Sequence, residues 1–340
     1  MKKMIHIVVA LALVLSLCAC TAPAAAPAAT EAPAATEAAS TENSAAPVET
    51  SEAKTFKVGV IQLTQHAALD AACEGFLEGL NASGLPVEVD VQNAQGEQAI
   101  CSTIATKFVN DGVELIMAIA TPAAQAAAQA TKDIPILVTA VTDPVSAGLA
   151  ASNEAPGGNV SGTSDMNPVA QQVDLLIKLA PEAKTVGIMY NSSEDNSILQ
   201  ANMAREALEA KGLTVMDFTV SASNEVQAVA QTAVSKVDAI YIPTDNLLAD
   251  TMATVSMVAT PAGIPIICGE SNMVNAGGLA TYGISYKQLG LQTAAQAVKI
   301  LSEGADTATM PIEYCNADLE LTINEEIASQ LGITIPADLK

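Results

Sequence analysis

Three polar residues, Thr244, Asp245 and Asn246, follow a short apolar run rich in β-branched residues at positions 237–242. Such a run is typical of a buried strand in a parallel sheet, and a helical stretch follows it. Ligands bind to open α/β sheets at the carboxyl ends of the strands. A carboxylate placed there can hold a cationic group, and a hydroxyl and an amide can orient it. The pattern therefore predicts a binding site at this edge.

Other predicted strands also end in polar side chains. Such residues are often only N-caps of the next helix, and capping accounts for most of these positions. The polar groups at 191–196 and 244–246 are more numerous than capping requires, which favours a site. With those above, the candidate ligand-binding residues are His66, Leu69, Thr121, Thr142, Asp143, Asn191, Glu194, Asn196 and Glu270.

The sequence offers little for catalysis. His66 is the only histidine after residue 6, and there is no Gly-x-Ser-x-Gly elbow, phosphate-binding glycine loop or histidine pair for a metal. Two carboxylates facing each other would resemble the catalytic pair of a glycosidase, but acidic residues at the ends of strands also occur in binding proteins. We therefore predict a binding protein that is not an enzyme and has no cofactor and no metal site.

Three blocks recur in the same order. Residues 57–61 resemble 184–188, 113–121 match 237–245, and 134–137 resemble 264–267. The offsets of 124 to 130 predict two similar lobes, each a parallel sheet flanked by helices. We expect an α/β fold in which residues 55–164 with 281–312 form the first lobe, and 165–280 with 313–340 form the second. A cleft between the lobes could close on a small molecule.

The first 54 residues differ from the rest. Residues 1–19 combine a basic start with an apolar run and predict a signal peptide. The Leu-x-Ala-Cys order resembles a bacterial lipobox, which would make Cys20 the lipidated first residue. Residues 20–54 are rich in Ala, Pro, Thr and Glu and predict a disordered tether. We therefore expect an extracytoplasmic protein held to the membrane only by its lipid anchor.

The charge excludes several partners. The formal net charge is −23 and the chain has one arginine, Arg205. So acidic a protein repels nucleic acid and anionic lipid. A phosphate or dicarboxylate ligand would favour an arginine fork, which a single arginine cannot readily supply, so we expect no such ligand. The four cysteines of the body favour free thiols, with a Cys73–Cys101 bridge as the alternative.

Several ordered motifs resemble the substrate-binding lipoproteins of ABC importers related to the tryptophan-binding TrpX type. They are residues 141–149, 156–164, 190–197, 241–246 and 280–286. The resemblance implies a two-lobed fold of the type I periplasmic binding proteins, an aromatic amino acid ligand (Trp, Tyr or Phe), and ABC permease and ATPase subunits as partners. We expect a monomer. The alternatives are another small solute (a branched amino acid, nucleoside or sugar) or a surface adhesin or sensor.

For an aromatic amino acid, the chemistry suggests a role for each group. The ammonium needs a carboxylate, with Asp245 as first choice and Glu194 or Glu270 next. Without an arginine, the ligand's carboxylate would bind hydroxyls and helix-start N–H groups near Thr121, Thr142, Asn191 and Ser192. The ring would contact Leu69, and His66 could meet a polar ring substituent.

Overall fold

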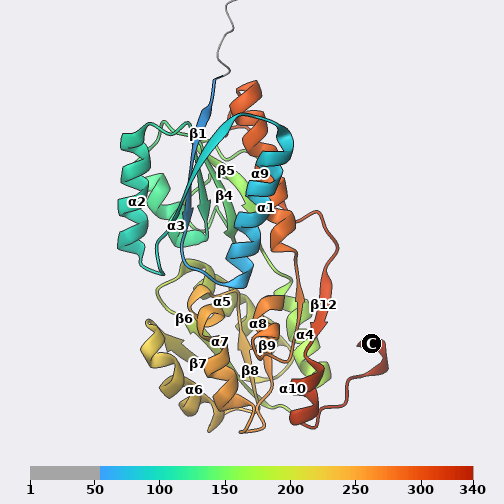
Figure 1. Cartoon of the computed structure of the whole chain (residues 1–340). Coiled ribbons are helices and arrows are strands. Elements are labelled where there is room, and N and C mark those ends of the chain that lie inside the picture. The colour runs from blue at the N-terminus through green and yellow to red at the C-terminus, as the bar shows by residue number, and fades with distance from the viewer. Residues whose placement is uncertain (1–53, 340) are drawn as a thin grey trace, which may run out of the picture. The chain divides into compact units, whose positions relative to one another are not determined.

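The computed structural model describes residues 54–339. The predicted signal peptide, Cys20 and the tether up to residue 53 lie outside the described residues. Within the described part, no helix is both long enough and apolar enough to cross a membrane. Figure 1 shows two groups of strands, each covered by helices.

The first lobe is built on a six-stranded sheet in which all the neighbouring pairs are parallel. Its strands, from one edge to the other, are β2 (Val87–Asn93), β1 (Phe56–Gln62), β3 (Leu115–Ile119), β4 (Ile136–Val141), β5 (Val160–Ser164) and β11 (Glu313–Tyr314). Its helices are α1 (Ala67–Ser83), α2 (Gln98–Asp111), α3 (Thr121–Ala130) and α9 (Tyr286–Glu303).

The second lobe repeats this plan. Its strands, in the same order across the sheet, are β7 (Thr214–Val220), β6 (Thr185–Asn191), β8 (Ala239–Ile242), β9 (Ile266–Cys268), β10 (Ala280–Gly283) and β12 (Glu320–Ile323). Its helices are α4 (Val169–Leu179), α5 (Asp195–Ala210), α6 (Val226–Val234), α7 (Asn246–Ala259), α8 (Ser271–Asn275) and α10 (Glu325–Gln330), with short 3₁₀ turns at Ser223–Glu225 and Ala337–Leu339. The matching strand order confirms the two similar α/β lobes that the repeated blocks predict.

The sheet pairing differs from the predicted lobe boundaries in two places. The expected first-lobe segment began at residue 281, but β10 pairs with β9 and β12 in the second sheet. The expected second-lobe segment began at residue 313, but β11 pairs with β5 in the first. An apolar pattern predicts that a strand forms but not which strand it pairs with. The predicted lobe boundaries at residues 281 and 313 are therefore each wrong by one short strand. The last strand, β12, runs antiparallel to β10.

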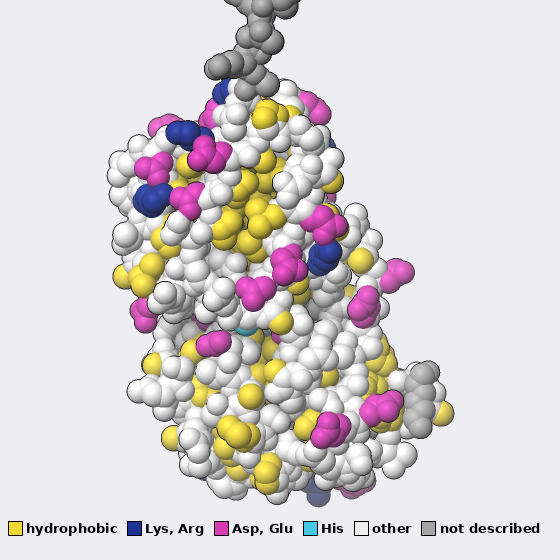
Figure 2. Space-filling model, in the orientation of Figure 1, with side chains coloured by type: hydrophobic (Ala, Val, Ile, Leu, Met, Phe, Trp, Pro, Cys, Tyr) yellow, Lys and Arg dark blue, Asp and Glu magenta, His cyan; other side chains and the backbone are white. Residues whose placement is uncertain are grey.

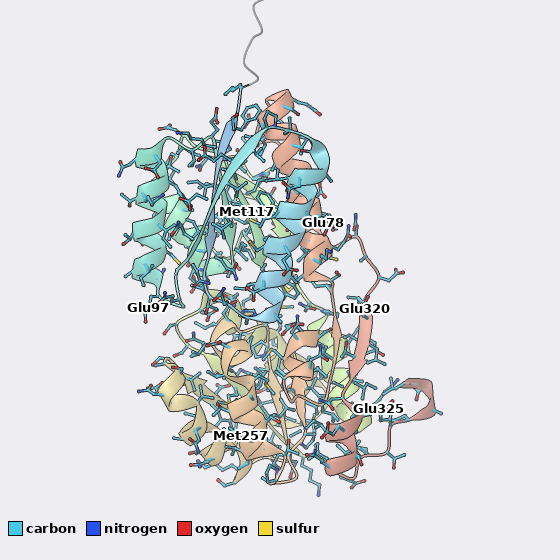
Figure 3. All side chains as sticks on the ribbon, viewed as in Figure 1. Glu78, Glu97, Met117, Met257, Glu320 and Glu325 are labelled. Carbon is cyan, nitrogen blue, oxygen red and sulfur yellow. The ribbon has the colours of Figure 1, made fainter. Side chains whose placement is uncertain are left out.

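The strands next to the centre of each sheet are buried on both faces because helices cover them. Met117 in β3 is fully buried, whereas Met257 on α7 is 71% exposed, and Figure 3 labels both. The four cysteines of the described residues are all free, as preferred from the sequence.

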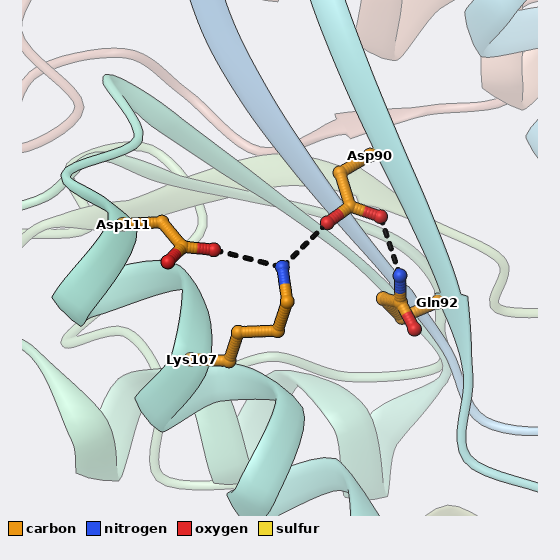
Figure 4. Close-up of polar contacts among 4 residues, drawn as sticks. All are labelled: Asp90, Gln92, Lys107 and Asp111. Atoms are coloured by element: carbon orange, nitrogen blue, oxygen red, sulfur yellow. Dashed lines mark hydrogen bonds and ion pairs between the residues drawn. The ribbon is translucent and has the colours of Figure 1, made fainter.

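Charged contacts lie mainly on the surface. Lys107 on α2 donates to Asp90 of β2 at 2.6 Å and to Asp111 at 2.7 Å, and Gln92 also donates to Asp90 (Figure 4). Exposed pairs of this kind contribute little to stability. On the face drawn in Figure 2, acidic side chains are more frequent than basic ones, in line with the net charge.

Helices α1 and α9 lie side by side in Figure 1 and approach closely at glycines. A Cβ atom on Gly290 of α9 would lie 2.1 Å from the carbonyl oxygen of Ala72, and one on Gly75 of α1 would lie 2.2 Å from that of Lys287. Backbone atoms cannot move aside as a flexible side chain can. This contact fixes α9, and with it Tyr286 at its first turn, against the first lobe.

Replacing Gly290 by Ala is therefore expected to lower the free energy of unfolding by about 1–3 kcal/mol, because the helices must separate. Gly158→Ala is the control, since no atom lies within 4 Å of the added Cβ. Urea unfolding followed by circular dichroism measures both. Equal stability of the two variants would contradict the close contact.

Candidate ligand-binding site

A small cavity lies where the carboxyl ends of strands from both sheets meet. It is lined by His66, Ala68, Leu69, Ala140, Thr142, Asp165, Asn196, Thr244, Asp245, Asn246, Ala249, Glu270 and Tyr286. Its volume is about 20 Å³, little more than one water molecule needs. A small organic ligand could enter only if the lobes moved apart, so this is a closed arrangement.

Hydrogen bonds between the lobes accompany the closure. His66 Nε2 lies 3.2 Å from Asn246 Oδ1, and Gln200 Nε2 donates to Thr142 Oγ1 at 3.0 Å. At the rim, Gln125 donates to Asp195 at 2.8 Å. Each bond joins an element of the first lobe to one of the second.

The cavity gathers eight of the twelve predicted ligand-binding residues: His66, Leu69, Thr142, Asn196, Thr244, Asp245, Asn246 and Glu270. The other four lie elsewhere. Asn191 and Glu194 line a neighbouring cleft. Thr121 is buried at the start of α3, and Asp143 accepts the N–H groups of residues 145 and 146 in a turn.

The Asp245 carboxylate is largely occupied by the backbone. It accepts Asn191 N–H at 2.6 Å and, as the N-cap of α7, Leu248 N–H at 2.8 Å. Burial raises the pKa of Asp245 to about 7, and the negative charge of Glu194 adds to this. Asp245 therefore joins β6 to α7 and has little capacity left for a ligand.

Glu270 has a similar place in the next turn of the same sheet. It caps α8 by accepting Asn272 N–H at 2.6 Å and Met273 N–H at 2.7 Å. Burial raises the pKa of Glu270 to about 7, and these hydrogen bonds only partly oppose the shift.

Sequence reasoning missed Asp165. It follows β5 directly but is not among the twelve candidate residues named from the sequence. Asp165 is 4% exposed, and its Oδ2 accepts the hydroxyl of Tyr286, also missed, at 2.7 Å. Its Oδ1 is buried with no hydrogen-bond partner among the described residues. Burial raises the pKa of the Asp165 carboxyl. The rule that polar residues at strand ends mark the site would have found it.

Glu194 orients three amides around the site. Its Oε1 accepts Asn191 Nδ2 at 2.9 Å, and its Oε2 accepts Asn246 Nδ2 at 2.5 Å and Asn196 Nδ2 at 3.4 Å. Both oxygens of Glu194 therefore act as acceptors toward these amides. Glu194, which lines the neighbouring cleft, thus holds these asparagines in place.

The cavity has an excess of hydrogen-bond acceptors. Three buried lining atoms have no partner among the described residues: His66 Nδ1, Asp165 Oδ1 and Asn196 Oδ1. Three carboxyl groups also line it, whereas no Lys or Arg does. Buried acceptors and charges are costly unless they are paired. The group that complements this cavity is therefore a cation with several N–H donors.

The raised pKa of Glu270 predicts a pH-dependent stability. Because the folded protein binds this proton more tightly than the unfolded chain, the stabilisation is full below the ordinary pKa near 4.5 and is lost as pH rises through about 7. As the pH rises from 5 to 8, the loss of the proton from Glu270 should lower the free energy of unfolding by about 2–3 kcal/mol. Urea unfolding without ligand should show this fall, and Glu270→Gln should reduce it by that amount. Glu320→Gln, at an exposed site, should not. An unchanged slope in Glu270→Gln would refute the assignment.

Comparisons with known proteins agree with this architecture. The family model described as "ABC transporter substrate binding protein" matches residues 57–340. The tyrosine-binding protein of Clostridioides difficile (strain R20291) is 41% identical over 289 residues, covering 84% of this chain and 83% of that protein.

Two solved structures add conformational information. The Streptococcus pneumonia ABC domain in complex with L-Trp is 40% identical, with a TM-score of 0.81, and covers 84% of this chain and 97% of that one. A ligand-free, open substrate binding protein with adhesive properties from Clostridium difficile is 45% identical but has a TM-score of only 0.65, covering 83% and 97%. The low TM-score against the open structure, despite its higher identity, agrees with closed lobes in this protein. The fold, the site at the strand ends and these matches show that the chain belongs to the ABC transporter substrate-binding protein family, a class of solute-binding proteins that work outside the cytoplasm.

Proposed function

We propose that this protein captures an aromatic amino acid in the cavity between its lobes and delivers it to the permease and ATPase subunits of an ABC importer. The observation that carries the proposal is the buried set of acceptors and carboxyl groups without a neighbouring Lys or Arg. An α-ammonium group supplies the missing charge and three N–H donors. The tyrosine-binding and tryptophan-bound relatives support the aromatic class.

Asp165 is the best carboxylate for the ammonium. Both oxygens of Asp245 and of Glu270 accept backbone N–H groups, and those of Glu194 accept the side-chain amides of asparagines. Asp165 alone among these four has an oxygen that is buried without a partner in the described part of the chain. Its pKa, raised by burial, would fall again beside a cation, so the ligand would stabilise the charged form.

The ligand's carboxylate would bind at the start of α1. His66, the N-cap, makes no side-chain capping bond, and Ala68 and Leu69 of the first turn line the cavity. First-turn N–H groups and the helix dipole favour an anion there. This arrangement replaces the arginine fork that the cavity does not have. The ring would pack on the apolar side chains of Leu69, Ala140 and Ala249.

We propose the remaining roles on the basis of the sequence. Lipidation at Cys20 and the tether of residues 20–54 would hold the protein at the outer surface of the cell membrane. We propose that it acts as a monomer and carries out no catalysis. Adhesion is a second candidate role, because one relative is described as having adhesive properties.

The proposal is tested by isothermal titration calorimetry of the purified protein with Tyr, Trp, Phe, Leu, a nucleoside and a hexose. We expect saturable binding of aromatic amino acids. In a parallel thermal-unfolding experiment, a ligand at a hundred times its dissociation constant should add about 2.7 kcal/mol to the free energy of unfolding and so raise the melting temperature. Binding of only the hexose, the nucleoside or leucine would contradict the aromatic ligand class.

Asp165→Asn should weaken tyrosine binding roughly 30-fold to several thousand-fold, because the ammonium loses its buried charge partner while the side chain keeps its shape. Asp143→Asn is the matched control: this carboxylate lies in a turn outside the cavity, and its loss should change affinity less than about twofold. Equal affinities of the two variants would show that Asp165 does not hold the ligand.

A further inference from the structure

The hydrogen bonds around His66 fix which ring nitrogen carries the proton. Asn246 Nδ2 donates to Glu194, whose two oxygens already act as acceptors for amide groups. Asn246 must therefore present its Oδ1 to His66, since turning the amide over would place two acceptors together. His66 Nε2, 3.2 Å from this oxygen, is then the N–H donor.

The second ring nitrogen, Nδ1, is consequently a bare acceptor in neutral His66. Burial lowers the pKa of His66, although Asn246 and the nearby carboxylates oppose the shift, so the ring is neutral at pH 7. Nδ1 is buried and has no hydrogen-bond partner in the described part of the chain, and His66 lines the cavity. An acceptor left in this state is costly, and a ligand donor would relieve the cost.

We propose that His66 Nδ1 accepts a hydrogen bond from the ring of the ligand, so that the site selects aromatic amino acids with a phenol hydroxyl or an indole N–H over phenylalanine. This inference rests on the proposed function, because it concerns the side chain of the amino acid whose ammonium Asp165 holds. The specificity comes from a chain of hydrogen bonds. Glu194 fixes the orientation of the Asn246 amide, and this amide fixes which nitrogen of His66 carries the proton. Bound phenylalanine would leave His66 Nδ1 buried without a hydrogen-bond partner. Sites that form a hydrogen bond with a polar ring substituent reject the analogue that lacks this substituent.

The test compares four ligands by isothermal titration calorimetry: tyrosine, tryptophan, phenylalanine and 4-fluorophenylalanine, whose fluorine is similar in size to a hydroxyl but cannot donate. For the unaltered protein we expect tyrosine and tryptophan to bind roughly 10- to 100-fold more tightly than the other two. Comparable affinities, within about threefold, for tyrosine and both analogues without a donor would overturn the inference.

The same titrations on His66→Phe locate the effect. We expect tyrosine to lose most of its advantage while phenylalanine binds at least as well as before; retained phenylalanine binding also shows that the variant is folded. Gln65→Ala, at the exposed neighbouring position, should keep the preference for tyrosine. An equal loss of affinity for tyrosine and phenylalanine would mean that His66 contacts a group the two amino acids share. That result would overturn this inference but not the proposed function. If no aromatic amino acid binds the unaltered protein, the proposed function is refuted together with it.

Discussion

A set of buried acceptors without a cation dominates this protein's binding site. Asp165, Asp245 and Glu270 enter one small cavity from three strand ends, and no Lys or Arg lines it. Asp245 and Glu270 accept backbone N–H groups on both oxygens, whereas one oxygen of Asp165 has no partner in the described residues. The raised pKa values of all three show the cost of this arrangement. A bound ammonium group would reduce that cost, so ligand binding and closure would stabilise each other.

The two sheets make this arrangement possible. Their matching strand orders place the carboxyl ends of β4, β5, β8 and β9 around one cavity, and the acidic residues follow three of these strands. Asp165 also lies where the chain leaves the first sheet for α4, and Tyr286, its partner, lies where the chain returns through α9. The hydrogen bond between them joins two of the three segments that cross between the lobes. A ligand that bound Asp165, as we propose, would therefore lie beside two of the segments that cross between the lobes.

Much of the fold could be predicted from the sequence, because buried parallel strands are continuous apolar runs and their helices have a clear apolar face. The repeated blocks also gave the two lobes. Strand neighbours are long-range properties, which is why β10 and β11 were assigned to the wrong lobes. The strand-end rule predicted eight lining residues but not what each does. Asp245 and Glu194 look alike as acidic residues near strand ends, yet one caps a helix and the other orients asparagines. Only their hydrogen-bond partners distinguish them.

The central claim is that the cavity recognises a cation. The most direct test is calorimetric titration with tyrosine, with tyramine, which lacks the carboxylate, and with 3-(4-hydroxyphenyl)propionate, which lacks the amine. The account predicts that tyrosine binds, that tyramine binds more weakly, and that the compound without the amine does not bind measurably. Binding of that compound as tightly as tyrosine would contradict it.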